Sequence, residues 1–100
     1  MTHRVVFLES AWQDFDEIYD WIADAAGPQT ANDYLIRVEN FCRNLRDFPD
    51  RGSPRADLKR GVRTVVFESR AVVAYVVDEA EVRIMRILHQ GRDPGREFRR

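Results

Sequence analysis

The sequence predicts an α+β protein in which an antiparallel helical hairpin packs on a small antiparallel sheet. An apolar, β-branched segment opens the chain, two segments with helical periodicity follow, and three strand-like segments form a meander near its end. The first strand is expected at residues 3–8 and the two helices at residues 11–25 and 28–48. The last three strands are expected at residues 62–67, 71–77 and 82–88. Elements in this order pack as one layer of helices on one layer of sheet.

The first helix is expected to follow Ser10. Ser10 and Gln13 have the spacing of a capping box, in which the two side chains satisfy backbone donors of the first turn. At 100° per residue the apolar side chains form one stripe and the acidic side chains fall opposite it. The stripe consists of Ala11, Phe15, Ile18, Ile22 and Ala25. The pattern therefore predicts an amphipathic helix with a strongly acidic exposed face.

Gly27 and Pro28 separate the two helices, because glycine tolerates a left-handed helix terminus and proline suits a first helical turn. So short a connection makes the helices antiparallel. The second helix is expected to end at Pro49. Its expected core stripe is Ala31, Leu35, Val38, Cys42 and Leu45, flanked by Tyr34, Phe41 and Phe48.

The second half of the chain is expected to begin with an irregular basic linker at residues 47–61, which proline and glycine interrupt. Residues 68–70 have the length of a hairpin turn, and an acidic turn at residues 78–81 precedes the last strand. Alternation in that strand places Arg83 and Ile84 on opposite faces. These features predict a three-stranded meander.

Length and composition exclude several classes of protein. One hundred residues predict a single domain, residues 1–100, and 44% hydrophobic residues are too many for a disordered chain. No apolar run approaches the ~18 to 20 residues of a membrane span. The short apolar run Val5–Leu8 lacks the features of a secretory signal, so the expected location is cytoplasmic. A single cysteine excludes an internal disulfide.

The net charge of −1 hides a segregation of charge along the chain. Residues 5–36 hold seven acidic and no basic residues, whereas residues 37–100 hold 15 basic and 10 acidic residues. Two interpretations remain open for the basic half. It is either a solvated face that balances the acidic helix, or a docking surface for nucleic acid or an acidic protein segment.

The sequence offers no complete catalytic set, no metal site and no cofactor motif. His3 and His89 are the only histidines, and neither lies in a metal-binding spacing. Cys42 falls on an apolar stripe, which predicts a buried and inert thiol. Trp21 falls off the main stripe of its helix, so it either covers a neighbouring element or anchors an interface.

Three segments are distinctive as an ordered set: FDEIYDWIAD at residues 15–24, LRDFPDRGSPRADLKRGVR at residues 45–63 and VRIMRILHQGRD at residues 82–93. Tyr75 lies between the last two segments and belongs to the same set. Together they resemble the ParE branch of the RelE/ParE toxin superfamily, from about Arg4 to Asp93. Such a match over nearly the whole chain is more specific than any one of its parts.

The resemblance implies a type II toxin that a ParD-like antitoxin neutralises by folding a disordered C-terminal segment over it. The implied target is DNA gyrase, and contact with DNA would come only through the antitoxin. The expected antitoxin-binding residues are Trp21, Tyr34, Phe41, Arg63, Arg83 and Arg86. The expected target-binding residues are Arg70, His89, Arg92 and Arg96.

Two alternatives accompany this hypothesis. The RelE branch cuts messenger RNA on the ribosome and generally carries a tyrosine near its C-terminus, where this chain has Phe98. A phenyl ring has no hydroxyl for general acid or base catalysis, although a phosphate-contacting set is present. That set is Arg70, Arg86, His89 and Arg92. The third hypothesis is a non-toxic binding module that represses its own operon together with the antitoxin.

Overall fold

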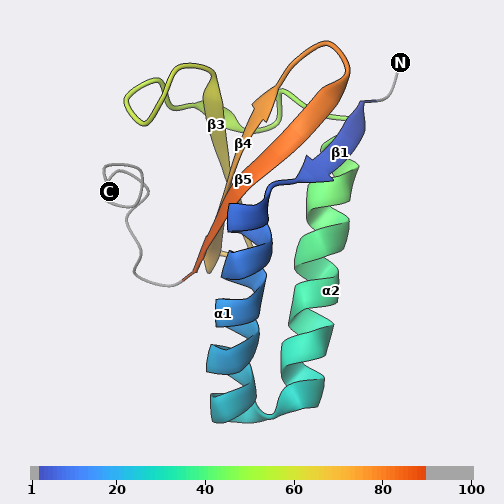
Figure 1. Ribbon diagram of the computed structural model, residues 1–100, viewed down its shortest axis with the longest axis vertical. Helices are drawn as coiled ribbons and strands as arrows, with labels where there is room; N and C mark the ends of the chain where they lie inside the picture. Colours follow the sequence, from blue (N-terminus) through green and yellow to red (C-terminus); the bar gives the residue numbers. More distant parts are fainter. Residues whose placement is uncertain (1–2, 90–100) are drawn as a thin grey trace.

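The computed structural model describes residues 3–89 and confirms the expected order of helices and strands, with one further short strand, β2 (Ser53–Pro54), inside the predicted linker. The elements are β1 (Arg4–Phe7), α1 (Glu9–Ala26), α2 (Pro28–Asn44), β2 (Ser53–Pro54), β3 (Val62–Phe67), β4 (Ala71–Val77) and β5 (Glu81–His89). The two helices lie side by side, and the end of the hairpin extends beyond the sheet (Figure 1).

The sheet has the strand order β1-β5-β4-β3-β2. The strands β3, β4 and β5 form the expected antiparallel meander. At the other edge β1 runs parallel to β5, with Phe7 opposite Ile84, so the sheet is mixed. This pairing corrects the expectation of a wholly antiparallel sheet. Periodicity identifies a strand but does not encode the direction from which a distant strand joins the sheet.

The start of α1 continues the hydrogen bonding of β1 to the edge of β5. The Leu8 N–H donates to the carbonyl of Ile84 (2.9 Å), which ends the strand pairing. Two residues later the Ser10 hydroxyl donates to the carbonyl of Met85 (2.6 Å). The predicted capping box is therefore wrong: α1 begins at Glu9, and the Ser10 hydroxyl bonds to β5 instead of its own helix.

The core lies between the hairpin and one face of the sheet. Its members include Ala11, Phe15, Ile18, Val38, Cys42 and Leu45 from the helices and Val73, Tyr75, Val82, Ile84 and Ile87 from the strands. Two positions differ from the predicted stripes. Ala25 is exposed because the end of α1 extends beyond the sheet (Figure 1). In α2, Tyr34 is buried, whereas Leu35 is only partly buried.

The predicted linker is tied to the sheet by Tyr75, whose side chain is fully buried. The Tyr75 hydroxyl donates to the carbonyl of Pro49 (2.8 Å) and accepts from the Gly52 N–H (2.8 Å). Arg63 donates from Nη1 to the carbonyl of Gly52 (2.7 Å). Residues 49–52 therefore have a defined position against β3 and β4.

The turn between β3 and β4 holds two residues in the left-handed region, Glu68 (φ 50°) and Ser69 (φ 59°). The Arg70 N–H donates to the carbonyl of Phe67 (3.0 Å), which closes the turn. Positive φ values at both central positions are the signature of a type I′ hairpin turn, which favours glycine at the second of them. A side chain at Ser69 therefore works against the observed backbone.

Substituting Ser69→Gly is expected to raise the free energy of unfolding by about 0.5–1 kcal/mol, because the left-handed backbone penalises any side chain. Urea denaturation followed by circular dichroism measures the change. Ser53→Gly, in the extended strand β2, serves as the control and is expected to give no gain. A lower midpoint for Ser69→Gly would contradict the prediction.

Candidate functional site

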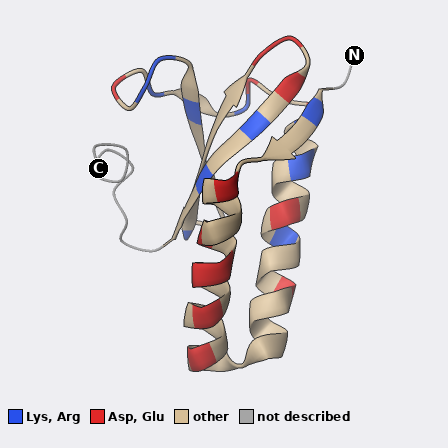
Figure 2. Cartoon of the chain, in the orientation of Figure 1, with Lys and Arg blue, Asp and Glu red and all other residues tan. Residues whose placement is uncertain are grey.

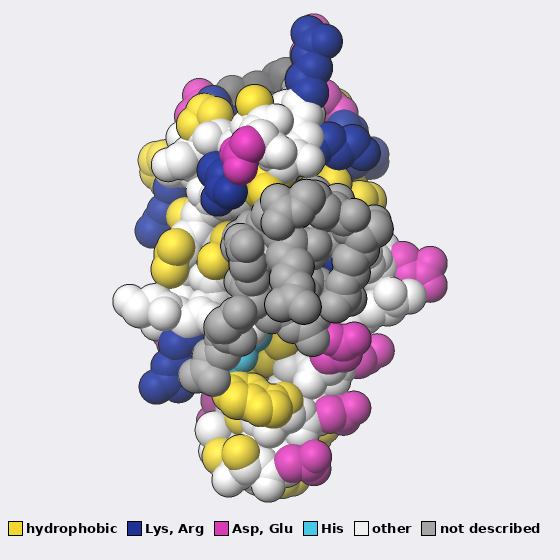
Figure 3. Space-filling view, turned by 90° about the vertical axis from the view of Figure 1, so that its left-hand side faces the viewer, with side chains coloured by type: hydrophobic (Ala, Val, Ile, Leu, Met, Phe, Trp, Pro, Cys, Tyr) yellow, Lys and Arg dark blue, Asp and Glu magenta, His cyan; other side chains and the backbone are white. Residues whose placement is uncertain are grey.

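The segregation of charge along the sequence is also a segregation in space. Acidic residues recur down α1, whereas Lys and Arg gather on the strands, the loops and the adjacent part of α2 (Figure 2). Seen from the side, hydrophobic side chains lie exposed between an acidic flank and a basic one (Figure 3). This face therefore combines apolar surface with charge, as interaction surfaces do.

Three of the arginines expected to bind the antitoxin make contacts within the chain. Arg83 pairs with Asp78, and Arg63 donates to the backbone carbonyl of Gly52. The guanidinium of Arg86 donates to both carboxylate oxygens of Asp14, at 2.8 and 3.0 Å. A partner that binds these arginines would have to share them with acceptors already in place.

Asp14 is 5% exposed and is absent from the site residues predicted from the sequence. One of its oxygens also accepts the Ile87 N–H (2.8 Å), so the carboxylate holds both a side chain and the backbone of β5. A signal for its burial exists in the sequence. Asp14 lies three residues after Ala11 and next to Phe15, which places it on the apolar stripe of α1.

Five aromatic rings form a continuous series, which we name the aromatic row: Trp21, His89, Tyr34, Phe67 and Phe41. Successive ring centroids are 4.9, 5.4, 6.0 and 4.9 Å apart. At one end Trp21 is 50% exposed. The row brings together residues that the sequence assigned to two different surfaces, because Trp21, Tyr34 and Phe41 were expected to bind the antitoxin and His89 the target.

Three guanidinium groups lie near the row: those of Arg37 and Arg51, each over a ring, and that of Arg70, whose charge acts on His89. Arg37 lies over the Tyr34 ring at 5.4 Å and pairs with Glu68 (2.9 Å). Arg51 lies over the Phe41 ring at 4.8 Å. Burial, together with the charge of Arg70, lowers the pKa of His89, so its imidazole is neutral at pH 7. Tyr34 and Phe67 are buried, so the row reaches the surface at Trp21 and through the partly buried His89 and Phe41, with cations beside it.

The hydroxyl of Tyr34 is buried and has no hydrogen-bond partner among residues 3–89. Burial raises the pKa of this phenol above its usual value, and the nearby Glu68 carboxylate adds to the shift. The Tyr75 hydroxyl, in contrast to that of Tyr34, makes two hydrogen bonds with the backbone. The two phenols therefore contribute to stability with opposite signs.

Tyr34→Phe is expected to raise the free energy of unfolding by about 1 kcal/mol, because it removes a buried donor that lacks an acceptor. Tyr75→Phe is expected to lower it by about 1–3 kcal/mol, because it leaves a buried backbone N–H unpaired. Chemical denaturation of both variants beside the wild type checks the pair. Loss of stability in Tyr34→Phe would mean that the Tyr34 hydroxyl of the wild type is hydrogen-bonded in solution.

The phosphate-contacting set predicted for an RNA-cleaving enzyme is only partly assembled. Arg70 and His89 interact electrostatically, whereas Arg86 is bonded to Asp14. Arg92 lies outside the described residues, as does Arg96. Residues 3–89 contain no group of three or more residues suited to hold a metal ion, and no helix among them is long and apolar enough to cross a membrane.

Cys42 is fully buried, and burial raises the pKa of its thiol to about 12. The group is therefore protonated at neutral pH and has little nucleophilic character. This agrees with the prediction of an inert thiol.

The chain is similar to known toxins over most of its length. Residues 5–94 match the family described as ParE toxin of type II toxin-antitoxin system, parDE. Toxin ParE3 of Caulobacter vibrioides is 31% identical over 85 residues, which are 85% of this chain and 84% of the relative. A solved structure titled "Chromosomal ParDE TA system from P. aeruginosa" has the same fold, with a TM-score of 0.78 at 24% identity, and covers 89% of this chain and 97% of that one. The chain therefore belongs to the ParE toxin family of type II toxin-antitoxin systems.

Proposed function

We propose that a ParD-like antitoxin neutralises this toxin by direct binding, and that the free toxin inhibits DNA gyrase and so blocks replication. Membership of the ParE family supports both parts. The aromatic row is the observation that carries the antitoxin part, because it reaches the surface at the half-exposed Trp21 and at the partly buried Phe41, over which the Arg51 guanidinium lies. Aromatic and arginine side chains together are the usual anchors of protein interfaces.

The shape of this surface favours a linear partner segment. Tyr34, in the middle of the row, is buried, so the surface comprises mainly the two ends of the row, Trp21 and Phe41. Three rings separate these two ends, so a partner must span them instead of covering one round patch. A disordered antitoxin tail that folds on binding suits such a surface, provided that it buries at least about 1,000 Å² to offset its ordering entropy.

Gyrase inhibition in this proposal is a binding effect and not catalysis. Arg86 is engaged by Asp14, and position 98 holds a phenylalanine in place of a catalytic tyrosine. The proposed target contacts are Arg70 and His89, together with Arg92 and Arg96 from the tail. DNA would be contacted only through the antitoxin.

Supercoiling by purified gyrase, measured with increasing toxin, tests the target. Loss of supercoiling that returns when antitoxin is added is the expected result. Arg70→Gln is expected to weaken inhibition, and Arg60→Gln, at an exposed loop position, serves as the control. Full gyrase activity at a large excess of toxin would refute this part of the proposal.

The proximity of Arg70 to a neutral His89 favours ribosome-dependent messenger RNA cleavage as a second candidate. Primer extension on transcripts after induction distinguishes it, because cleavage on the ribosome gives cuts in phase with codons. Intact transcripts would eliminate this candidate. Harmless expression without antitoxin would instead favour a binding module that acts only in repression.

A further inference from the structure

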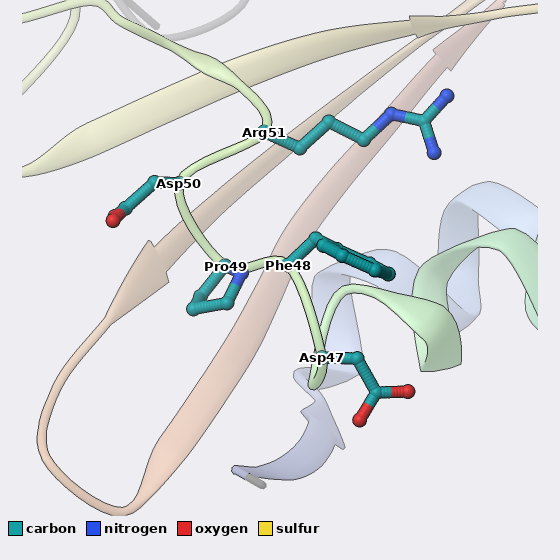
Figure 4. A pocket seen from close by; sticks show the side chains of 5 residues that line it. All are labelled: Asp47, Phe48, Pro49, Asp50 and Arg51. Atoms are coloured by element: carbon teal, nitrogen blue, oxygen red, sulfur yellow. The ribbon is translucent and has the colours of Figure 1, made fainter. Parts of the chain in front are cut away.

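A cavity of about 630 Å³ lies just after α2, lined by Asp47, Phe48, Pro49, Asp50 and Arg51. The Phe48 ring and the Arg51 guanidinium extend to the same side of the loop, whereas the Asp50 carboxylate points the other way (Figure 4). Phe48 is 66% exposed, although it is the most hydrophobic residue of the loop. The cavity therefore presents an apolar wall beside a cation.

The loop that carries this cavity is held in place before any partner arrives. The carbonyl of Pro49 and the N–H of Gly52 are both bonded to the buried hydroxyl of Tyr75. The Arg51 N–H donates to the carbonyl of Phe48 (3.1 Å). A preformed site loses little conformational entropy on binding, so contacts with an exposed Phe48 translate more fully into affinity.

The charge of Arg51 is available to a partner. Its guanidinium lies over the Phe41 ring, and within residues 3–89 it forms no ion pair. The nearby carboxylates are directed elsewhere, since Asp47 lies 3.9 Å from Arg46 and Asp50 lies 3.5 Å from Arg63. A carboxylate brought by a partner would therefore meet an unpaired and partly stacked guanidinium.

The cavity continues the aromatic row, because Arg51 stacks on Phe41, the last ring of that row. A partner segment that contacts the partly buried Phe41 reaches the cavity next. The cavity volume suits one or two large side chains and not a folded domain. Continuity and charge together favour the same linear, acidic segment.

We infer that the cavity between Phe48 and Arg51 anchors the antitoxin by taking one large apolar side chain that is flanked by a carboxylate. This inference rests on the proposed neutralisation by an antitoxin. The apolar side chain packs on Phe48 and Pro49, and the carboxylate pairs with Arg51. Neither Phe48 nor Arg51 was among the binding residues predicted from the sequence.

The experiment measures the affinity of the full-length toxin for purified antitoxin encoded beside it, by titration calorimetry. Phe48→Ala is expected to weaken binding at least about thirtyfold, as for an interface hot spot. Ile36→Ala removes an equally exposed side chain from α2 and is expected to change affinity less than about twofold. Unchanged melting temperatures would show that both variants fold.

The charge is tested separately. Arg51→Gln is expected to weaken binding about tenfold and to reduce its salt dependence, whereas Arg60→Gln serves as the matched control. Arg51→Glu should be rescued by changing one acidic residue of the antitoxin tail to arginine. Failure of every such reversal to restore affinity would overturn the pairing.

Three outcomes separate the inference from the proposal on which it rests. If wild-type toxin does not bind the antitoxin, the proposed neutralisation fails. If the wild type binds and Phe48→Ala binds equally well, only the anchor fails. If Phe48→Ala keeps its affinity but no longer inhibits gyrase, the cavity contacts the target, and the inference is overturned.

Discussion

Replacing Asp14 with alanine is expected to lower the free energy of unfolding by about 3–5 kcal/mol, because removing one member of a buried ion pair is strongly destabilising. The change takes the carboxylate from Arg86 and the acceptor from the Ile87 N–H. For a chain of 100 residues each kcal/mol lowers the melting temperature by about 4–8 °C. Thermal and urea denaturation measure the loss.

Two variants calibrate this result. Asp16→Ala changes an exposed carboxylate on the same helix and is expected to alter stability by less than about 0.5 kcal/mol. Asp14→Asn keeps an oxygen for the Ile87 N–H and loses the charge, so it should fall between the two. Equal stability of Asp14→Ala and Asp16→Ala would show that the buried pair contributes nothing.

The substitution Gly52→Ala is expected to destabilise the protein by about 2–3 kcal/mol through overpacking. A Cβ at this position would lie 2.7 Å from the Tyr75 hydroxyl and 2.9 Å from the backbone carbonyl of Thr64. Because the carbonyl belongs to β3, it cannot move aside as a flexible side chain can. The loop or the strand must shift instead.

Gly61→Ala is the matched control for crowding. A Cβ there meets no atom within 4 Å, although the φ of +84° makes any side chain unfavourable. Its expected loss is about 1 kcal/mol, from backbone strain alone. Denaturation of the two variants in parallel checks the order, and a smaller loss for Gly52→Ala than for Gly61→Ala would contradict the argument.

Periodicity was enough to predict every helix and strand except the short β2, because the longer elements bury one face, whereas both residues of β2 are exposed. Ala11, Phe15 and Ile18 of α1 and Val38, Cys42 and Leu45 of α2 are buried as expected. The sequence pattern did not predict the long-range hydrogen bonds. Ser10 has the local spacing of a cap, yet its hydroxyl bonds to a carbonyl 75 residues away. A local pattern has no information about such a partner.

The candidate site was predictable only in part. Trp21 lies off its stripe and is half exposed, as its angle on the helix indicated. Phe48 was placed on the flank of a helix that was expected to continue to Pro49. α2 ends at Asn44, and the following turn carries Phe48 into solvent. The Tyr75 hydroxyl holds Pro49 and Gly52 in place after the helix, and the sequence pattern does not encode this long-range contact.

The parallel pairing of β1 with β5 has a consequence for synthesis of the toxin. β1 is translated well before its partner in the sheet, which begins at Glu81. The nascent chain therefore carries an unpaired β1 edge and an Asp14 carboxylate without Arg86 and Ile87 until β5 emerges. A ribosome that stops before β5 releases a chain that cannot complete this sheet, so the native fold forms only after β5 has been translated.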